Sequence, residues 1–117
     1  MKKRTSVCVT LVVLSVALTA QAATWTKWRE VIDGRQNAID FRHAVDTFNY
    51  DGQRLIDWQF RNRYAESVKF DYEIHFEVSG GEHKEIGSLT LNRDETRGNR
   101  RLGIKVICAR IKNLRLL

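Results

Sequence analysis

The stretch SVKFDYEIHFEV, residues 67–78, decides the fold because apolar and polar side chains alternate along its whole length. One set of positions carries the apolar side chains Val68, Phe70, Tyr72, Ile74, Phe76 and Val78. The other set carries Ser67, Lys69, Asp71, Glu73, His75 and Glu77. A period of two is that of a β-strand with one face on a core and the other in water. The stretch therefore predicts a long, half-buried strand.

The same alternation recurs on the N-terminal side of this stretch. In residues 55–62 it predicts a strand with Ile56, Trp58 and Phe60 facing inward. In residues 38–45 it places Ile39, Phe41 and Val45 against Asp40 and Arg42. Weaker strands are expected at residues 25–31 and 84–91, and no segment shows the apolar stripe of a helix.

The last segment, residues 100–116, changes phase along its length. Leu102, Ile104 and Val106 share one face, whereas Ile107, Ala109 and Ile111 bring apolar side chains to the opposite face. A bulge, a switch between two sheets, or burial on both faces would each explain this change.

Short strands separated by glycine-containing turns are typical of an antiparallel sandwich. The turns fall at Asp33-Gly34, Asp51-Gly52, Gly80-Gly81 and Gly98-Asn99. Residues 57–63 followed by 68–72 resemble paired strands of immunoglobulin-like or fibronectin-type modules. The resemblance implies an all-β fold, a single antiparallel β-sandwich of about six or seven strands. The Cys-Trp-Cys framework of true immunoglobulin domains is missing, so the resemblance concerns the fold and transfers no functional residue.

Residues 1–22 have the pattern of a secretory signal peptide. Lys2, Lys3 and Arg4 precede an uncharged, mostly apolar run, and the small-x-small sequence Ala20-Gln21-Ala22 follows it. An uncleaved membrane anchor is the alternative, but several hydroxyl and amide side chains interrupt the run. We therefore expect a periplasmic or secreted protein, a single domain over residues 23–117, with no transmembrane span after cleavage.

Cleavage changes the charge and the cysteine count of the working chain. Loss of three cations reduces the 20 basic residues to 17, against 14 acidic residues. Of the two cysteines, only Cys108 remains, which excludes an intramolecular disulfide. Alternation with Ile104 and Val106 predicts that Cys108 points inward as an inert thiol. The alternative is an intermolecular disulfide.

Basic residues gather toward the C-terminus, where no acidic residue follows Glu95. They are the candidate contacts for an anionic partner: Arg93, Arg97, Arg100, Arg101, Lys105, Arg110, Lys112 and Arg115. An anionic lipid, a glycan or an acidic protein surface would suit this charge. Nucleic acid is not expected as a partner because no aromatic stacking platform is interleaved with the cations. Protection of an edge strand by charge is the alternative explanation.

The chain offers no convincing catalytic, cofactor or metal site. His75 and His83 flank the Gly80-Gly81 turn, but pairing Phe76 with Ile86 across this hairpin would leave His83 in the loop. A zinc site needs three or four ligands at defined spacing. His43 shares a face with Phe41, and is expected either at the core edge or beside a pocket. We expect no enzyme activity.

Binding is the function that these patterns favour. The expected protein is a small exported, envelope-associated module that binds a protein, either itself or another, through strand edges, loops and the basic C-terminal region. The alternative is a binder of an anionic surface or glycan through that basic region. Trp25 and Trp28 would face opposite sides of one strand, so one of them is available as a contact anchor or as cover for an edge.

Overall fold

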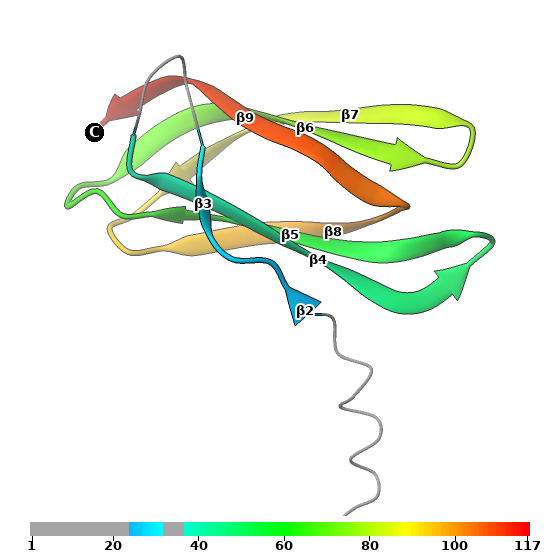
Figure 1. Cartoon of the computed structure of the whole chain (residues 1–117). Helices are drawn as coiled ribbons and strands as arrows, with labels where there is room; N and C mark the ends of the chain where they lie inside the picture. Colours follow the sequence, from blue (N-terminus) through cyan, green and yellow to red (C-terminus); the bar gives the residue numbers. More distant parts are fainter. Residues whose placement is uncertain (1–23, 32–36) are drawn as a thin grey trace, which may run out of the picture.

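The structure is a computed structural model, and it describes residues 24–31 and 37–117 (Figure 1). The predicted signal peptide, residues 1–22, lies outside the described residues. Every described element is a strand. They are β2 (Thr24–Trp25), β3 (Arg29–Glu30), β4 (Ile39–Tyr50), β5 (Gln53–Asn62), β6 (Val68–Val78), β7 (Gly81–Leu91), β8 (Thr96–Gly103) and β9 (Lys105–Leu116).

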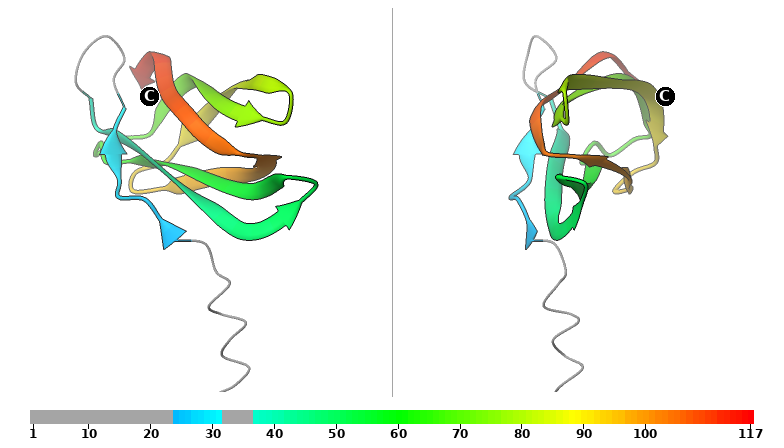
Figure 2. Two further views of the ribbon diagram at one scale, coloured as in Figure 1. Left: turned by 45° about the vertical axis from the view of Figure 1, so that its right-hand side comes forward. Right: turned by 90° about the vertical axis from the view of Figure 1, so that its right-hand side faces the viewer.

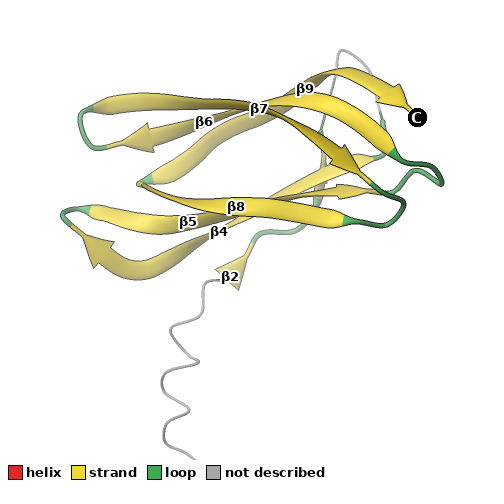
Figure 3. Cartoon of the chain, turned by 180° about the vertical axis from the view of Figure 1, so that it is seen from behind, coloured by secondary structure: helices red, strands yellow, loops and turns green. Residues whose placement is uncertain are grey.

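The strands form two antiparallel sheets that pack face to face. Sheet 1 has the order β2-β4-β5-β8, with β3 also paired to β4, and sheet 2 has the order β7-β6-β9. Figures 2 and 3 show the two sheets as separate layers. The all-β antiparallel sandwich expected from the alternation is confirmed. The likeness to immunoglobulin-like modules lies in this two-layered architecture.

The core lies between the sheets, and most of it consists of residues that the alternation placed inward. In β6 these include Phe70, Ile74 and Phe76, each fully buried. From β5, Trp58 and Phe60 meet them, and the Phe60 and Phe70 rings lie 5.3 Å apart, edge to face. Burial of each such side chain contributes about 1.5–3 kcal/mol, so these strands supply most of the drive to fold.

The β6–β7 hairpin has a shorter loop, and therefore a different register, than the sequence suggested. Val78 pairs with Gly81, which places Phe76 opposite His83 and Glu73 opposite Ile86. The expected pairing of Phe76 with Ile86 is therefore wrong. Because Glu73 faces outward, Ile86 does too, and its side chain is 65% exposed.

The chain passes from sheet 1 to sheet 2 between β8 and β9. β8 pairs with β5, and β9 pairs with β6. At the crossing, the Ile104 amide donates to the carbonyl of Glu77 at 2.7 Å. Gly103 fits here because a Cβ would lie 3.0 Å from Ile56 Cδ1 and 3.3 Å from the Glu77 carbonyl oxygen. The switch between sheets is thus one cause of the phase change in residues 100–116.

A β-bulge is the second cause of that phase change. The register shifts where Cys108 pairs with His75 but Val106 pairs with Phe76, which leaves Ile107 without a cross-strand partner. Val106 therefore faces the core, and Ile107 is 50% exposed. Leu102, expected to face inward, is 40% exposed because it pairs with Leu55, which lies on the face of β5 opposite the buried Ile56.

Asn62 joins the two loops at one end of the sandwich. Its side chain is fully buried, and its amide nitrogen donates to three backbone carbonyls, of Glu66 at 2.8 Å, Asn92 at 3.0 Å and Leu91 at 3.3 Å. Its amide oxygen accepts from the Tyr64 amide at 2.8 Å. All the hydrogen-bonding groups of one buried side chain are therefore used to hold β5 to the ends of β6 and β7.

Replacing Asn62 by Ala leaves these buried backbone groups without their partner. We expect Asn62→Ala to lower the free energy of unfolding by about 2 kcal/mol, measured by urea denaturation. The control is Asn92→Ala, which removes one exposed contact, Asn92 Oδ1 to Ser67 Oγ at 3.2 Å. Equal losses for the two variants would contradict the role given to Asn62.

Candidate functional site

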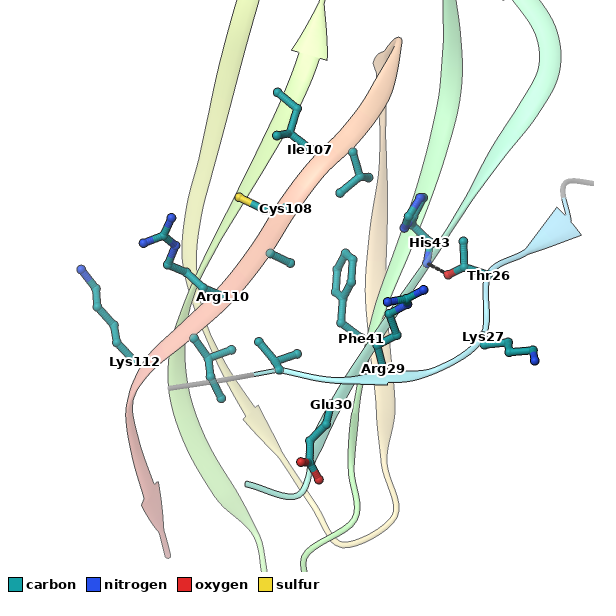
Figure 4. A pocket seen from close by; sticks show the side chains of 14 residues that line it. Thr26, Lys27, Arg29, Glu30, Phe41, His43, Ile107, Cys108, Arg110 and Lys112 are labelled. Carbon is teal, nitrogen blue, oxygen red and sulfur yellow. Dashed lines mark hydrogen bonds between the residues drawn. The ribbon is translucent and has the colours of Figure 1, made fainter. Parts of the chain in front are cut away.

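A pocket of about 900 Å³ lies between sheet 2 and the N-terminal part of sheet 1 (Figure 4). One wall is β9. The opposite wall is β4 together with residues 24–31, and we call residues 24–31 the strap. The lining residues of β9 are 106–112, and those of the other wall are Thr26, Lys27, Arg29, Glu30, Val31, Phe41 and His43.

The pocket follows the free edge of β9. In the β6–β9 register, Ala109 lies opposite the buried Ile74, whereas Arg110 lies opposite the outward-facing Glu73. Side chains from both faces of β9 line the same pocket. A cavity lined by both faces of a strand must run along its edge. Within the described chain, β6 is the strand that pairs with β9, and no strand pairs with its other edge. We call this pocket the β9 groove.

Stacked tryptophan and arginine side chains hold the strap on sheet 1. The guanidinium of Arg42 lies 4.3 Å from the ring centroids of both Trp25 and Trp28, and that of Arg61 lies 4.3 Å from Trp28. Trp25 and Trp28 were expected to face opposite sides of a single strand, which is wrong. In place of one strand there are two short ones, β2 and β3, and the irregular residues 26–28 between them allow both rings to reach Arg42.

An ion-pair cluster fixes the other end of the strap. Asp40, which is 4% exposed, accepts from Arg63 Nε at 2.6 Å and from Arg61 Nη2 at 2.7 Å. Arg63 also reaches Glu30 of β3, at 2.9 Å. Burial alone would raise the pKa of Asp40, but the hydrogen bonds from Arg63 and Arg61 outweigh it and hold the pKa below its ordinary value of 3.8.

The eight candidate cations of the C-terminal region do not gather at one place. Five of them have a carboxylate partner: Arg93 with Asp94, Arg97 with Glu95, Arg100 with Asp57, Arg101 with Glu85 and Lys105 with Glu77. They are also divided among the β7–β8 loop, β8 in sheet 1 and β9 in sheet 2. A single basic face is therefore not formed by this set.

Arg110, Lys112 and Arg115 differ from the other five because no described carboxylate lies within 4.0 Å of their charged atoms. Arg110 and Lys112 line the β9 groove. On the opposite wall, Lys27 and Arg29 also have no ion-pair partner among the described residues. These two cations were not singled out from the sequence, because Lys27 and Arg29 lie far from the C-terminal cluster and carry no motif. Only the fold brings them opposite β9.

Cys108 faces outward, not inward as expected. It pairs with His75, whose neighbours Ile74 and Phe76 are buried, so the two share the outer face of sheet 2. The bulge at Ile107 reverses the alternation that the sequence suggested. In Figure 4 its sulfur lies on the same side of β9 as Arg110 and Lys112. The thiol is free and half-buried.

The three histidines occupy separate environments. Both ring nitrogens of His75 contact carboxylates, Nε2 to Glu73 at 2.5 Å and Nδ1 to Glu82 at 2.6 Å, and these contacts raise its pKa. His83 faces the other side of the hairpin, opposite Phe76. His43 lines the β9 groove, where burial lowers its pKa. In the described part of the chain, no three potential metal ligands of the His, Cys, Asp and Glu types come together.

The strap is tied to β4 by backbone as well as by side chains. Thr26 and His43 exchange two hydrogen bonds, from the Thr26 amide to the His43 carbonyl at 2.8 Å and from the His43 amide to Thr26 Oγ1 at 3.1 Å. The Val31 amide donates to the Ile39 carbonyl at 2.8 Å. The wall opposite β9 is thus a fixed part of sheet 1. No helix within residues 24–31 and 37–117 has the length and apolar character needed to cross a membrane.

Comparisons with known proteins add little to this geometry. No family model matches the sequence, and no curated protein matches it. The crystal structure of a DUF1425 family member from Shewanella sp. pv-4 is similar, with 12% sequence identity and a TM-score of 0.44. The likeness covers 82% of this chain and 96% of that one. A likeness at this level supports no conclusion about function.

Substitution of Asp40 tests how the strap is held. A folded-state pKa below the unfolded one gives stability that is present above about pH 4 and is lost as the pH falls through the folded pKa. We expect Asp40→Asn to lower the free energy of unfolding by about 1–3 kcal/mol at pH 7, and the difference from the parent to shrink on acidification. Urea denaturation between pH 2 and 7 measures both.

The control for Asp40 is Asp57→Asn. Asp57 pairs with Arg100 at 2.7 Å, but the Arg100 side chain is 59% exposed, so the expected loss is below about 1 kcal/mol. A stability difference between Asp40→Asn and the parent that stays constant across this pH range would refute the assignment.

The outward position of Cys108 makes a second test simple. In an oxidising buffer the purified chain without residues 1–22 should form a dimer that runs as such on a non-reducing gel and disappears on reduction. Cys108→Ser is the control and should stay monomeric on the gel. A parent chain that gives no disulfide-linked dimer after prolonged oxidation would exclude the intermolecular thiol.

Proposed function

We propose that this chain is an exported, non-catalytic protein-interaction module that binds an extended polypeptide segment along the free edge of β9. The binding mode is strand addition, in which backbone hydrogen bonds supply affinity and alternate side-chain contacts supply specificity. Export rests on the signal-peptide pattern of residues 1–22.

The observation that supports this proposal is the position of the β9 groove. Outside a barrel, the edge strand of a sheet carries a row of backbone N–H and C=O groups that no strand uses, and proteins commonly block such an edge. Here the edge is accompanied by a cavity whose far wall is fixed to sheet 1 by the strap. The free edge of β9 is thus available to a guest strand, and β4 and the strap form the opposite wall of the space that the guest would occupy.

The dimensions of the groove suit one strand. β9 contributes residues 106–112, a length of about 23 Å at about 3.3 Å per residue. The volume of about 900 Å³ lies in the usual range for ligand pockets, about 300–1,000 Å³. Its deeper part is apolar, with Val31, Phe41 and Ile111 each less than one tenth exposed. A guest strand would therefore bury side chains as well as backbone.

Binding to an anionic lipid or glycan surface through the C-terminal cations is the second candidate, and it is less well supported. Five of the eight cations are ion-paired, and the set is divided between both sheets. A surface binder of this kind predicts affinity for anionic vesicles that falls steeply with salt.

Selection from a random peptide library on the immobilised mature chain tests the proposal. We expect selected peptides to slow hydrogen exchange of the backbone amides in residues 106–112, because strand addition engages these amides. Peptides that protect the loops or the outer face of sheet 1 instead would overturn the assignment of the groove.

A groove-filling variant gives a second readout. Ala109 is half-buried beside the groove, so Ala109→Tyr should lower the affinity for the selected peptides at least tenfold. The matched control is Thr90→Tyr, on the exposed outer face of β7 in the same sheet, which should leave affinity unchanged. Urea denaturation of both variants checks that each one folds.

A further inference from the structure

We infer that the β9 groove selects segments in which apolar and acidic side chains alternate. This inference rests on the proposed function, and it names the chemistry of the partner. A strand added to β9 places successive side chains on opposite faces of sheet 2. One set would enter the space between the sheets, and the other would lie on the outer face beside the outward side chains of β9.

The inward set would meet the apolar part of the groove lining. Ala109 and Val106 of β9 pack against the core, and Phe41 faces them from β4. Polar side chains on the inward set would lose their hydration here without compensation, which is costly. Apolar residues at every second position of the guest are therefore favoured.

The outward set would meet Arg110 and Lys112. In Figure 4 these two side chains lie on one side of β9, and Phe41 and His43 lie across the groove. Opposite charges on neighbouring strands attract when they share a face of the sheet. Acidic residues are therefore favoured at the interleaved positions of the guest.

The carboxylates of β6 leave these cations available. Asp71, opposite Lys112, accepts instead from Ser88 at 2.5 Å and from Asn113 at 2.7 Å. Glu73, opposite Arg110, is occupied by His75 at 2.5 Å. Lys112 and Arg110 still attract Asp71 and Glu73 through space, but neither cation forms an ion pair with them within 4.0 Å, so each can pair with a guest carboxylate.

The wall opposite β9 is also positively charged. Lys27 and Arg29 add two more cations, and Glu30 is the acidic residue among the pocket-lining positions. Its carboxylate is neutralised by Arg63 at 2.9 Å. The net positive charge of the groove therefore favours an acidic guest and opposes a basic one.

β6 itself shows that such a strand fits β9. Along the paired edge of β9, Tyr72 and Ile74 face the core while Asp71 and Glu73 lie opposite Lys112 and Arg110. The side chains of β9 stand perpendicular to the sheet, so a strand on either edge has them as neighbours. The pattern already accepted on one edge of β9 is thus the pattern expected on the other.

Three synthetic nonapeptides test the inference, with valine alternating with glutamate, glutamine or lysine. Titration calorimetry with the mature chain should give an affinity for the glutamate peptide about tenfold above that of the glutamine peptide, and the lysine peptide should bind weakest. Hydrogen exchange of residues 106–112 reports in parallel whether each peptide lies at the edge of β9.

Charge reversal on the protein should reverse this order. Arg110→Glu combined with Lys112→Glu should favour the lysine peptide, and Arg110→Gln alone should lower the preference for glutamate without reversing it. The control, Arg93→Glu with Arg97→Glu, makes the same change of net charge outside the groove and should leave the order intact.

The outcomes separate the two proposals. Equal affinity for the three peptides, with residues 106–112 protected, would overturn the preference for acidic residues and leave strand addition standing. Protection elsewhere, or no binding by any peptide, would overturn both. Binding of vesicles rich in phosphatidylglycerol that is lost on Arg110→Glu, with no peptide bound, would assign the groove to a lipid and likewise overturn both.

Discussion

The hydrogen bond from the Ile104 amide to the Glu77 carbonyl marks the constraint on which the arrangement depends. At this point the chain leaves sheet 1, and the next residues pair with β6 instead of continuing beside β5. If residues 96–116 formed a hairpin within one sheet, sheet 2 would lack β9. The crossing closes one end of the sandwich and places the edge of β9 opposite the strap. The β9 groove is a result of this single change of sheet.

The strap side of the groove keeps its shape because side-chain contacts, added to a short backbone pairing, hold the strap on sheet 1. β2 and β3 contain two residues each, which is too short to be stable by backbone pairing alone. Arg42 and Arg61 add to this pairing by stacking on Trp25 and Trp28, and Arg63 adds to it by pairing with Glu30 of β3. Arg42, Arg61 and Arg63 therefore have a structural role, whereas Arg110 and Lys112 on β9 form no ion pair within 4.0 Å and no ring contact with the described residues.

The strands and the inward residues of β5 and β6 could be predicted from the sequence, because alternation in these strands is uninterrupted. The register in which the strands pair could not be predicted from the sequence. A three-residue difference in the β6–β7 register moved Ile86 from the core to the surface, and one bulge residue, Ile107, turned Cys108 outward. Such shifts depend on turn geometry and on the neighbouring sheet, which leave no local signal. The groove was hidden for the same reason, since its walls lie far apart in the chain.

The similarity between β6 and the strand that suits the free edge has a kinetic consequence. In an unfolded copy of the chain, residues 68–78 are available to pair with the free edge of β9 in a folded copy. They would compete there with the guest strand. The β6–β7 hairpin closes over only the Ser79-Gly80 turn, whereas pairing with β9 brings together residues separated by a much longer segment. Short-range contacts of this kind form first, because less chain entropy is lost in closing them. The hairpin therefore occupies one edge of β6 early, which leaves only its other edge, the one that pairs with β9, open to exchange between copies during folding.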